Sequence, residues 1–142
     1  MAITLLKTIQ EQSGYGATIL FTLTSDGGGT DLTGVLLDVS ADLAAHNSIA
    51  VADIRILNLS IVTQGIAISL NWEDAQGDEH IITCPANQQI KECWEHMGGL
   101  KWNHATGKNG DINFAAINPA SAAATDNAVI TMKVRKRYTA PA

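Results

Sequence analysis

The chain has 142 residues, of which 46% are hydrophobic and 16% charged, and its formal net charge at pH 7 is -5. So apolar a chain, with fewer charges than the roughly 25% of ordinary soluble domains, is not an intrinsically disordered protein. The negative balance argues against nucleic-acid binding through bulk charge, and no apolar run approaches the roughly 18 residues of a membrane-spanning helix.

The start of the chain lacks the basic and continuous apolar regions of a secretory signal, so we expect synthesis and folding in a cytoplasm. Cys84 and Cys93 are too few for a disulfide framework and are expected to be reduced thiols. Whether they pair with each other stays open at this point.

Segment 1–14 is apolar at four positions before a Gly-Tyr-Gly break. These positions are Ile3, Leu5, Leu6 and Ile9. We expect this segment to be either an edge strand of the core or an arm that docks on a neighbouring subunit. Residues 15–142 are expected to form a single β-sandwich domain.

Alternation of apolar and polar residues predicts two strands in the next part of the chain, over 17–24 and 35–40. The apolar positions expected to share an inner face are Ala17, Ile19, Phe21 and Leu23 in the first strand, and Val35, Leu37 and Val39 in the second. The glycines and aspartates of 25–31 predict the loop between them.

The segment 54–74 predicts a hairpin if Gln64 and Gly65 form its turn. That register places four apolar pairs on one side and sets Arg55 opposite Asp74. The pairs are Thr63 with Ile66, Ile61 with Ile68, Leu59 with Leu70, and Leu57 with Trp72. A second turn at 76–77 would place Ile81 opposite Trp72 and complete a three-stranded meander that ends at Pro85.

Two more strands are predicted towards the C-terminus, one after an Asn-Gly turn at 109–110 and a last one over 128–135. Segment 118–126 is expected to be an exposed loop. Helix is limited to single turns at 42–46, where Asp42 would be the capping residue, and at 88–95.

Seven or eight short strands separated by turn-rich loops predict an all-β protein with little helix. The expected architecture is an antiparallel β-sandwich, jelly-roll-like, or alternatively a small barrel.

No pattern of reactive residues predicts an enzyme or a cofactor site. Cys84, Cys93, His96 and His104 do not have the spacing of a zinc site, and we predict no metal. The acidic group Glu73, Asp74, Asp78 and Glu79 is best interpreted as a solvated hairpin tip, because it does not follow a calcium-loop pattern. Nucleophile-elbow and phosphate-loop motifs are missing from the sequence.

The C-terminal stretch 133–138 collects four of the nine basic residues, at Lys133, Arg135, Lys136 and Arg137, and continues the last predicted strand. Lys133, Arg135 and Arg137 would point to one side. This row is interpreted first as a solvated sheet face or a protected edge, and second as a surface that docks on an acidic protein partner.

The order of elements from residue 50 onward resembles small virion proteins of tailed bacteriophages, of the capsid decoration (cement) or minor head type. The segments that carry the resemblance are Leu70-Asn71-Trp72-Glu73-Asp74, Gly98-Gly99-Leu100-Lys101-Trp102, Thr106 to Ile112, and Ile130 to Lys136. The sequence departs from the pattern by the insertion Lys108-Asn109-Gly110 and by its two cysteines.

The resemblance implies a structural protein of the virion that binds the major capsid protein and itself, as a homotrimer or another symmetric oligomer. It brings no catalytic residues, and nucleic acid and membrane are not expected partners. The hypothetical contact residues are Ile3, Leu5, Leu6, Lys133, Arg135 and Arg137. The alternatives are another virion subunit (tail tube, head completion or fibre base) and a carbohydrate-binding or hydrolytic β-sandwich, for which Trp94 and Trp102 would have to lie together on the surface.

Overall fold

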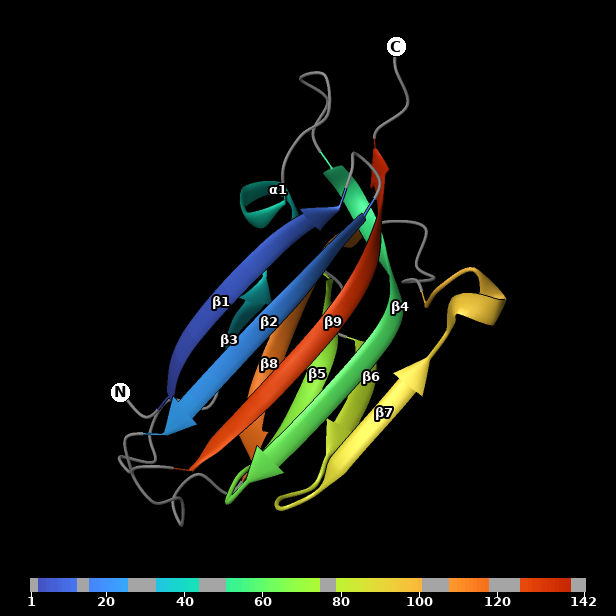
Figure 1. Ribbon diagram of the computed structural model, residues 1–142. Helices are drawn as coiled ribbons and strands as arrows, with labels where there is room; N and C mark the ends of the chain where they lie inside the picture. The colour runs from blue at the N-terminus through green and yellow to red at the C-terminus, as the bar shows by residue number, and fades with distance from the viewer. Residues whose placement is uncertain are drawn as a thin grey trace.

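The protein is a two-layer antiparallel β-sandwich, seen here in a computed structural model (Figure 1). The structure describes residues 3–12, 16–25, 33–43, 51–74, 79–100, 108–117 and 126–138. Its elements are β1 (Ile3–Gln12), β2 (Gly16–Ser25), β3 (Thr33–Leu37), α1 (Val39–Asp42), β4 (Val51–Gln64), β5 (Ala67–Asp74), β6 (Glu79–Cys84), β7 (Gln89–Cys93), the 3-10 helix η1 (Glu95–Met97), β8 (Lys108–Ile117) and β9 (Asn127–Tyr138).

The strands form a five-stranded sheet A, in the order β1-β2-β9-β4-β7, and a four-stranded sheet B, in the order β3-β8-β5-β6. Within sheet A, β2 pairs with β9 and β4 with β7; within sheet B, β3 pairs with β8 and β5 with β6. These pairs are those of one long hairpin that has been rolled up, which is the jelly-roll topology. The expected all-β, jelly-roll-like sandwich is therefore confirmed.

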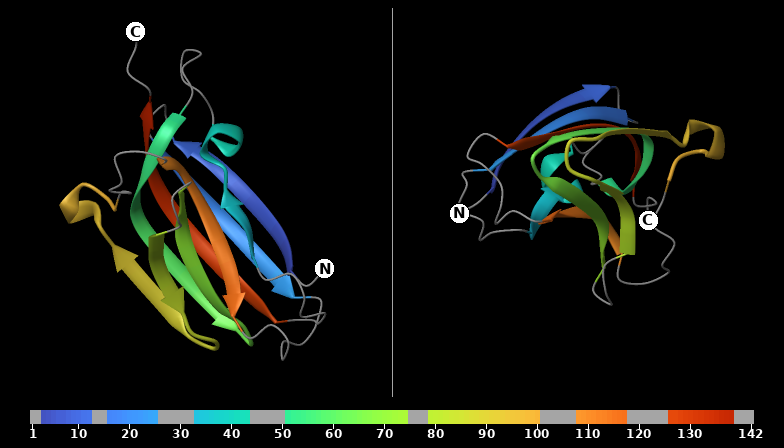
Figure 2. Two further views of the ribbon diagram at one scale, coloured as in Figure 1. Left: turned by 180° about the vertical axis from the view of Figure 1, so that it is seen from behind. Right: turned by 90° about the horizontal axis from the view of Figure 1, so that it is seen from below.

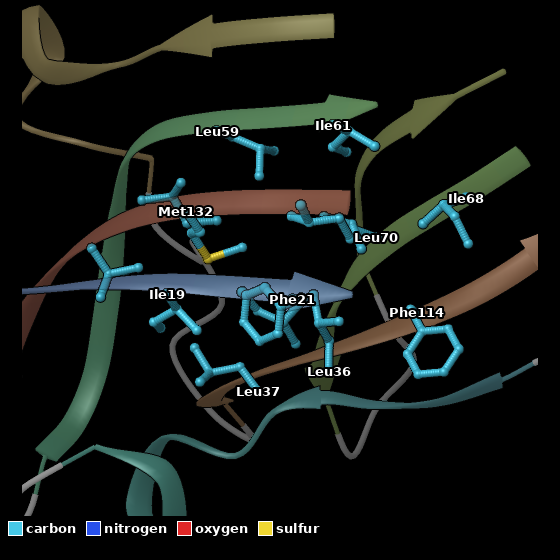
Figure 3. Close-up of a cluster of buried hydrophobic side chains, with 14 of the residues drawn as sticks. Ile19, Phe21, Leu36, Leu37, Leu59, Ile61, Ile68, Leu70, Phe114 and Met132 are labelled. Carbon is cyan, nitrogen blue, oxygen red and sulfur yellow. The ribbon is translucent and has the colours of Figure 1, made fainter. Parts of the chain in front are cut away.

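The core lies between the two sheets and is built from the apolar phase of each strand (Figures 2 and 3). All four predicted inner positions of β2, from Ala17 to Leu23, are fully buried. Of these, Ile19 and Phe21 face Leu36 and Leu37 across the sandwich, with Leu70 and Phe114 beside them (Figure 3).

The predicted hairpin at Gly65 is wrong, because β4 and β5 belong to different sheets. Gly65 and Ile66 form a bend that takes the chain from sheet A to sheet B, and Ile61 pairs instead with Ile90 and Ile130. The predicted common face is nevertheless real: Leu59, Ile61, Ile68 and Leu70 are all buried, and they meet across the sandwich. The alternation of apolar and polar residues shows which residues share one face of a strand. A hairpin and two facing sheets would both bring these apolar residues together, so the alternation does not distinguish the two arrangements.

Local irregularities change the expected partners of several residues. The register of β4 shifts between Ile56 and Asn58, so Leu57 is not buried although Trp72 is. A second shift, in the β5–β6 hairpin, sets Glu79 rather than Ile81 opposite Trp72. A bulge adds a residue to one strand and reverses the side on which the following residues lie.

The strand pairing within each sheet also separates Arg55 of β4 from Asp74 of β5. Arg55 lies opposite Arg135, and Asp74 lies opposite Lys108. The predicted charge pair is therefore absent from this register, since each residue belongs to a different sheet.

Secondary structure near β3 and β7 also departs from expectation. A shift in β3 leaves Val35 exposed and buries Leu36 and Leu37. The helical turn is α1, which starts earlier than predicted because Asp38 is its N-cap and accepts a hydrogen bond from Ala41 N–H.

The second predicted helical turn, 88–95, is instead strand β7 followed by η1. The backbone of residues 89–93 pairs with β4, and this ladder outweighs a weak local preference. Asn109 and Gly110 are part of β8 and do not form a turn. The loops expected at 26–31 and 118–125 and the turn at 76–77 lie outside the described residues.

No helix of the described segments is long and apolar enough to cross a membrane.

Candidate functional site

The outer face of sheet A collects residues from all five strands in register. One row runs through Leu6, Thr22, Val129, Val62 and Gln89, and the next through Thr8, Leu20, Thr131, Ser60 and Lys91. A third row runs through Gln10, Thr18, Lys133, Asn58 and Cys93. In Figure 1 these strands lie side by side in the front layer.

An apolar patch occupies this face towards the end where β9 begins. We define it as Leu6, Leu20, Val62 and Val129. Leu6 is 66% exposed, and Leu20 and Val62 are each 43% exposed. Three of the large hydrophobic side chains that the structure exposes thus gather in neighbouring rows of one sheet face, and such clustering is typical of an interaction surface.

The middle of the face is hollowed and carries hydroxyl and amide groups together with the charged side chains of Lys91, Glu92 and Lys133. A depression of about 450 Å³ lies over β2, β9, β4 and β7, and Thr18, Asn58, Ser60 and Thr131 are among its lining residues. Glu95 of η1 spans its rim, since it accepts hydrogen bonds from Asn58 at 3.2 Å and from Lys133 at 3.3 Å. Lys133, at this rim, is also part of a basic region.

The basic region lies at the opposite end, where β4 begins and β9 ends (Figure 1). We define the basic cluster as Arg55, Lys133, Arg135 and Arg137. Arg137 forms a two-pronged ion pair with the carboxylate of Asp53, with its Nε 2.8 Å from Oδ1. The hydrogen bond and the charge of Asp53 raise the pKa of Arg137, so this guanidinium is permanently charged.

The predicted contact residues separate into two groups. Leu6, Lys133, Arg135 and Arg137 all belong to the outer face of sheet A. Leu5 is on the other side of β1, half-buried against the core. Ile3 pairs with Ser25 through its backbone, and its side chain is outside the described residues.

Four residues of the apolar patch and the basic cluster were not predicted as contact residues: Leu20, Val62, Val129 and Arg55. The sequence does contain a signal for the first three, because each is an apolar residue in the solvent-facing phase of an alternating strand. Only the tertiary structure shows that they are neighbours.

Strand β1 is an edge strand, paired with β2 over its whole length. Its inner side is tied to the sandwich, because Lys7 contacts Asp42 at 2.6 Å and the Leu36 carbonyl oxygen at 3.2 Å. Glu11 forms a further ion pair, with Lys136 of β9. Residues 3–12 of the segment 1–14 therefore form an edge strand of the sandwich.

The cysteines and histidines tested as a zinc set are dispersed. Cys84 is buried and Cys93 exposed, both as free thiols, and His96 is exposed in η1. His104 lies outside the described residues. No group of three His, Cys, Asp or Glu side chains within the described segments could hold a metal ion.

Sheet B carries a pair of carboxyl groups at Glu73 of β5 and Asp111 of β8. The predicted acidic tip belongs to the β5–β6 hairpin, where Glu79 is exposed; the side chains of Asp74 and Asp78 lie outside the described residues. Val39 N–H donates to Asp111 Oδ1 at 2.8 Å. Burial, together with the charges of Asp38 and Glu73, raises the pKa of Asp111 to about 6. The carboxyl of Asp111 thus secures α1 to β8, which is a structural role.

The aromatic side chains of the described segments do not form an exposed platform. Trp72 is 2% exposed and Trp94 is half-buried against the core; Trp102 is not described. Recognition of a sugar by stacking needs an exposed aromatic face, and among the described aromatic residues only Trp94 and Tyr138 are partly accessible.

Comparison with known proteins adds a remote structural likeness. No protein-family model and no curated protein matches the sequence. Among solved structures, a mutant of the family 29 carbohydrate binding module CBM29-2 aligns with a TM-score of 0.39 and 12% identity, over 93% of this chain and 91% of its own. A second family 29 module aligns with a TM-score of 0.39 and 11% identity, over 96% and 90% of the two chains.

Proposed function

We propose that the protein is a structural virion protein of a tailed bacteriophage, a decoration protein that binds the capsid and stabilises the head lattice. It docks on the major capsid protein through the outer face of sheet A and acts as a homotrimer or another symmetric oligomer. It is made in the cytoplasm of a bacterial host, is not an enzyme, and needs neither nucleic acid nor membrane.

The observation that carries the proposal is the composition of that face. An apolar patch, a hollowed middle with polar and charged side chains, and a basic cluster lie on one face over five paired strands. A stable interface needs roughly 800 Å² on each partner, with an apolar centre and a polar rim. A five-stranded face has the required extent, since strands lie about 4.8 Å apart and rise about 3.4 Å per residue.

The resemblance of segments 70–74 and 98–102 to phage decoration proteins points to the same class. In the structure these segments serve the scaffold: Trp72 fills the core, and Gly98 to Leu100 fix the start of β4, as Leu100 bridges to Ile56 in both directions at 2.8 and 2.9 Å. A binder of this kind stabilises a shell by mass action, because it binds the assembled lattice and not its free subunits.

The test is binding to capsids of the phage whose genome encodes the chain, prepared without this protein. Leu6→Asp places a charge in the apolar patch and should reduce co-sedimentation with capsids at least tenfold. Val35→Asp is the matched control, because Val35 is 46% exposed on sheet B. A point substitution changes the surface alone, whereas deletion of residues 1–13 would also remove β1 from sheet A.

Equal binding of the Leu6→Asp variant and the parent would refute docking through this face. The copy number in the particle distinguishes a decoration protein from another virion subunit. A decoration protein is present in proportion to the capsid subunits, whereas a tail, head-completion or fibre-base subunit occurs in few copies.

A further inference from the structure

We propose that the groove at the basic end of sheet A binds side-chain carboxylates of an acidic segment in the partner protein. The groove has a volume of about 390 Å³ and is lined by Arg55, Arg135, Lys136, Arg137 and Tyr138. This proposal rests on the proposed function, in that it names the chemistry by which one end of the docking face recognises its partner.

The first argument is the position of two like charges. Arg55 of β4 and Arg135 of β9 are directly opposite each other in the sheet. Side chains opposite each other in neighbouring strands start about 5 Å apart, and like charges in this position destabilise the pair. A carboxylate that binds between the two guanidinium groups would turn this repulsion into two charge-assisted contacts.

The second argument is that the groove is already organised. Arg137, two residues from Arg135 on the same side of β9, is held by Asp53. Arg55 Nη1 lies 3.5 Å from the Gly98 carbonyl oxygen, and the backbone of Gly99 is packed against its Cβ. Arginines that are fixed before binding lose little conformational freedom when a ligand arrives.

The third argument is the balance of charge inside the groove. Lys136 is paired with Glu11, and Arg137 with Asp53. Within the described part of the chain, neither Arg55 nor Arg135 has an ion pair, and Arg135 is exposed. Two positive charges therefore remain for an incoming ligand, which suits one or two carboxylates.

The class of partner follows from the rest of the molecule. Four of the nine Lys and Arg residues line this groove, yet the whole chain has a net charge of -5. Nucleic-acid binding depends on many phosphate contacts. Outside the groove the negatively charged surface would repel the remaining phosphates of such an extended polyanion. A short acidic peptide presents its carboxylates locally, and the guanidinium fork matches their geometry.

The experiment uses the purified full chain and a fluorescent hexaglutamate peptide, followed by anisotropy at low and at physiological salt. Binding should weaken at least tenfold in both Arg135→Gln and Arg55→Gln, and it should weaken as salt rises. Lys91→Gln is the control on the same face, since Lys91 is exposed outside the groove. Hexaglutamine should not bind, and thermal unfolding should show that every variant is folded.

Equal affinity of the Arg135→Gln variant and the parent for hexaglutamate would overturn the proposal. So would tighter binding of single-stranded DNA of the same charge, abolished by the same substitutions. Capsid binding separates the two proposals: peptide binding without capsid binding contradicts the decoration role alone, whereas capsid binding that Arg135→Gln leaves unchanged contradicts the groove alone.

Discussion

Lys136 of β9 forms an ion pair with Glu11 of β1, and only 1% of the lysine side chain is exposed to solvent. Lys136 lies on the inner side of β9, next to the core residue Val134. The pair therefore joins the edge strand to the centre of sheet A from within the sandwich. With the contact between Lys7 and Asp42, it gives the N-terminal segment two polar attachments in addition to its backbone ladder.

The carboxylate of Glu11 compensates the buried charge of Lys136, so removal of this carboxylate should lower the free energy of unfolding. Glu11→Gln should lower the free energy of unfolding by about 2 kcal/mol, because a buried ammonium then loses its counter-charge. Lys136→Met, which keeps the volume but removes the charge, should be nearly neutral. Urea unfolding of both variants measures this, and a Glu11→Gln variant as stable as the parent would contradict it.

The raised pKa of Asp111 should make stability depend on pH. Its pKa is about 6 in the folded protein against an ordinary 3.8, so the folded state binds the proton more tightly. The free energy of unfolding should therefore fall as pH rises from about 4 to 6, by about 1 kcal/mol once solvent screening of this partly exposed group is allowed for. Asp111→Asn should flatten this part of the profile and be at least as stable at pH 7. A slope in Asp111→Asn equal to that of the parent, with Glu92→Gln as control, would disprove the assignment.

Gly99 should tolerate no side chain. Its φ is +101°, and a Cβ there would lie 2.7 Å from the Cβ of Arg55. Gly99→Ala should lower the free energy of unfolding by about 2 kcal/mol or more, through backbone strain and this clash. Gly98→Ala is the matched control, because its φ of +80° is also strained but its nearest contact is an ordinary 3.5 Å. Thermal unfolding should rank the parent above Gly98→Ala and Gly98→Ala above Gly99→Ala; any other order would show that the close approach to Arg55 is relieved at little cost.

Thr63 should matter through its hydroxyl. The Oγ1 donates to the Pro85 carbonyl oxygen at 2.5 Å and accepts from Gln88 N–H at 3.2 Å, which secures the turn from β6 to β7. Thr63→Val should lower the free energy of unfolding by about 1 kcal/mol, since the partly buried Pro85 carbonyl oxygen and Gln88 N–H lose their hydrogen-bond partner. Thr63→Ser keeps the hydroxyl and should lose less. Amide hydrogen exchange at Gln88 should accelerate in Thr63→Val only, and unchanged exchange would argue against the clamp.

The sequence predicted which side of most strands is buried, and the structure confirms this for β2, β5 and the end of β4. The prediction of the buried side was wrong where a bulge reverses the alternation of inward and outward side chains, as at Leu57 and Val35. One extra residue in a strand cannot be recognised from the pattern of apolar residues. The prediction also failed for Arg55, whose predicted partner Asp74 followed from a hairpin that the chain does not form.

The sequence by itself determined an all-β sandwich with little helix, because alternation with a period of two specifies strands and the faces that they bury. Only the tertiary structure decided which strands are neighbours, since pairing between residues distant in the chain depends on how the sheets roll up and not on local pattern. That pairing assembles Leu6, Leu20, Val62 and Val129 into one patch and sets Arg55 opposite Arg135. The elements of the candidate site are thus legible in the sequence, but their meeting on one face is a product of the jelly-roll topology.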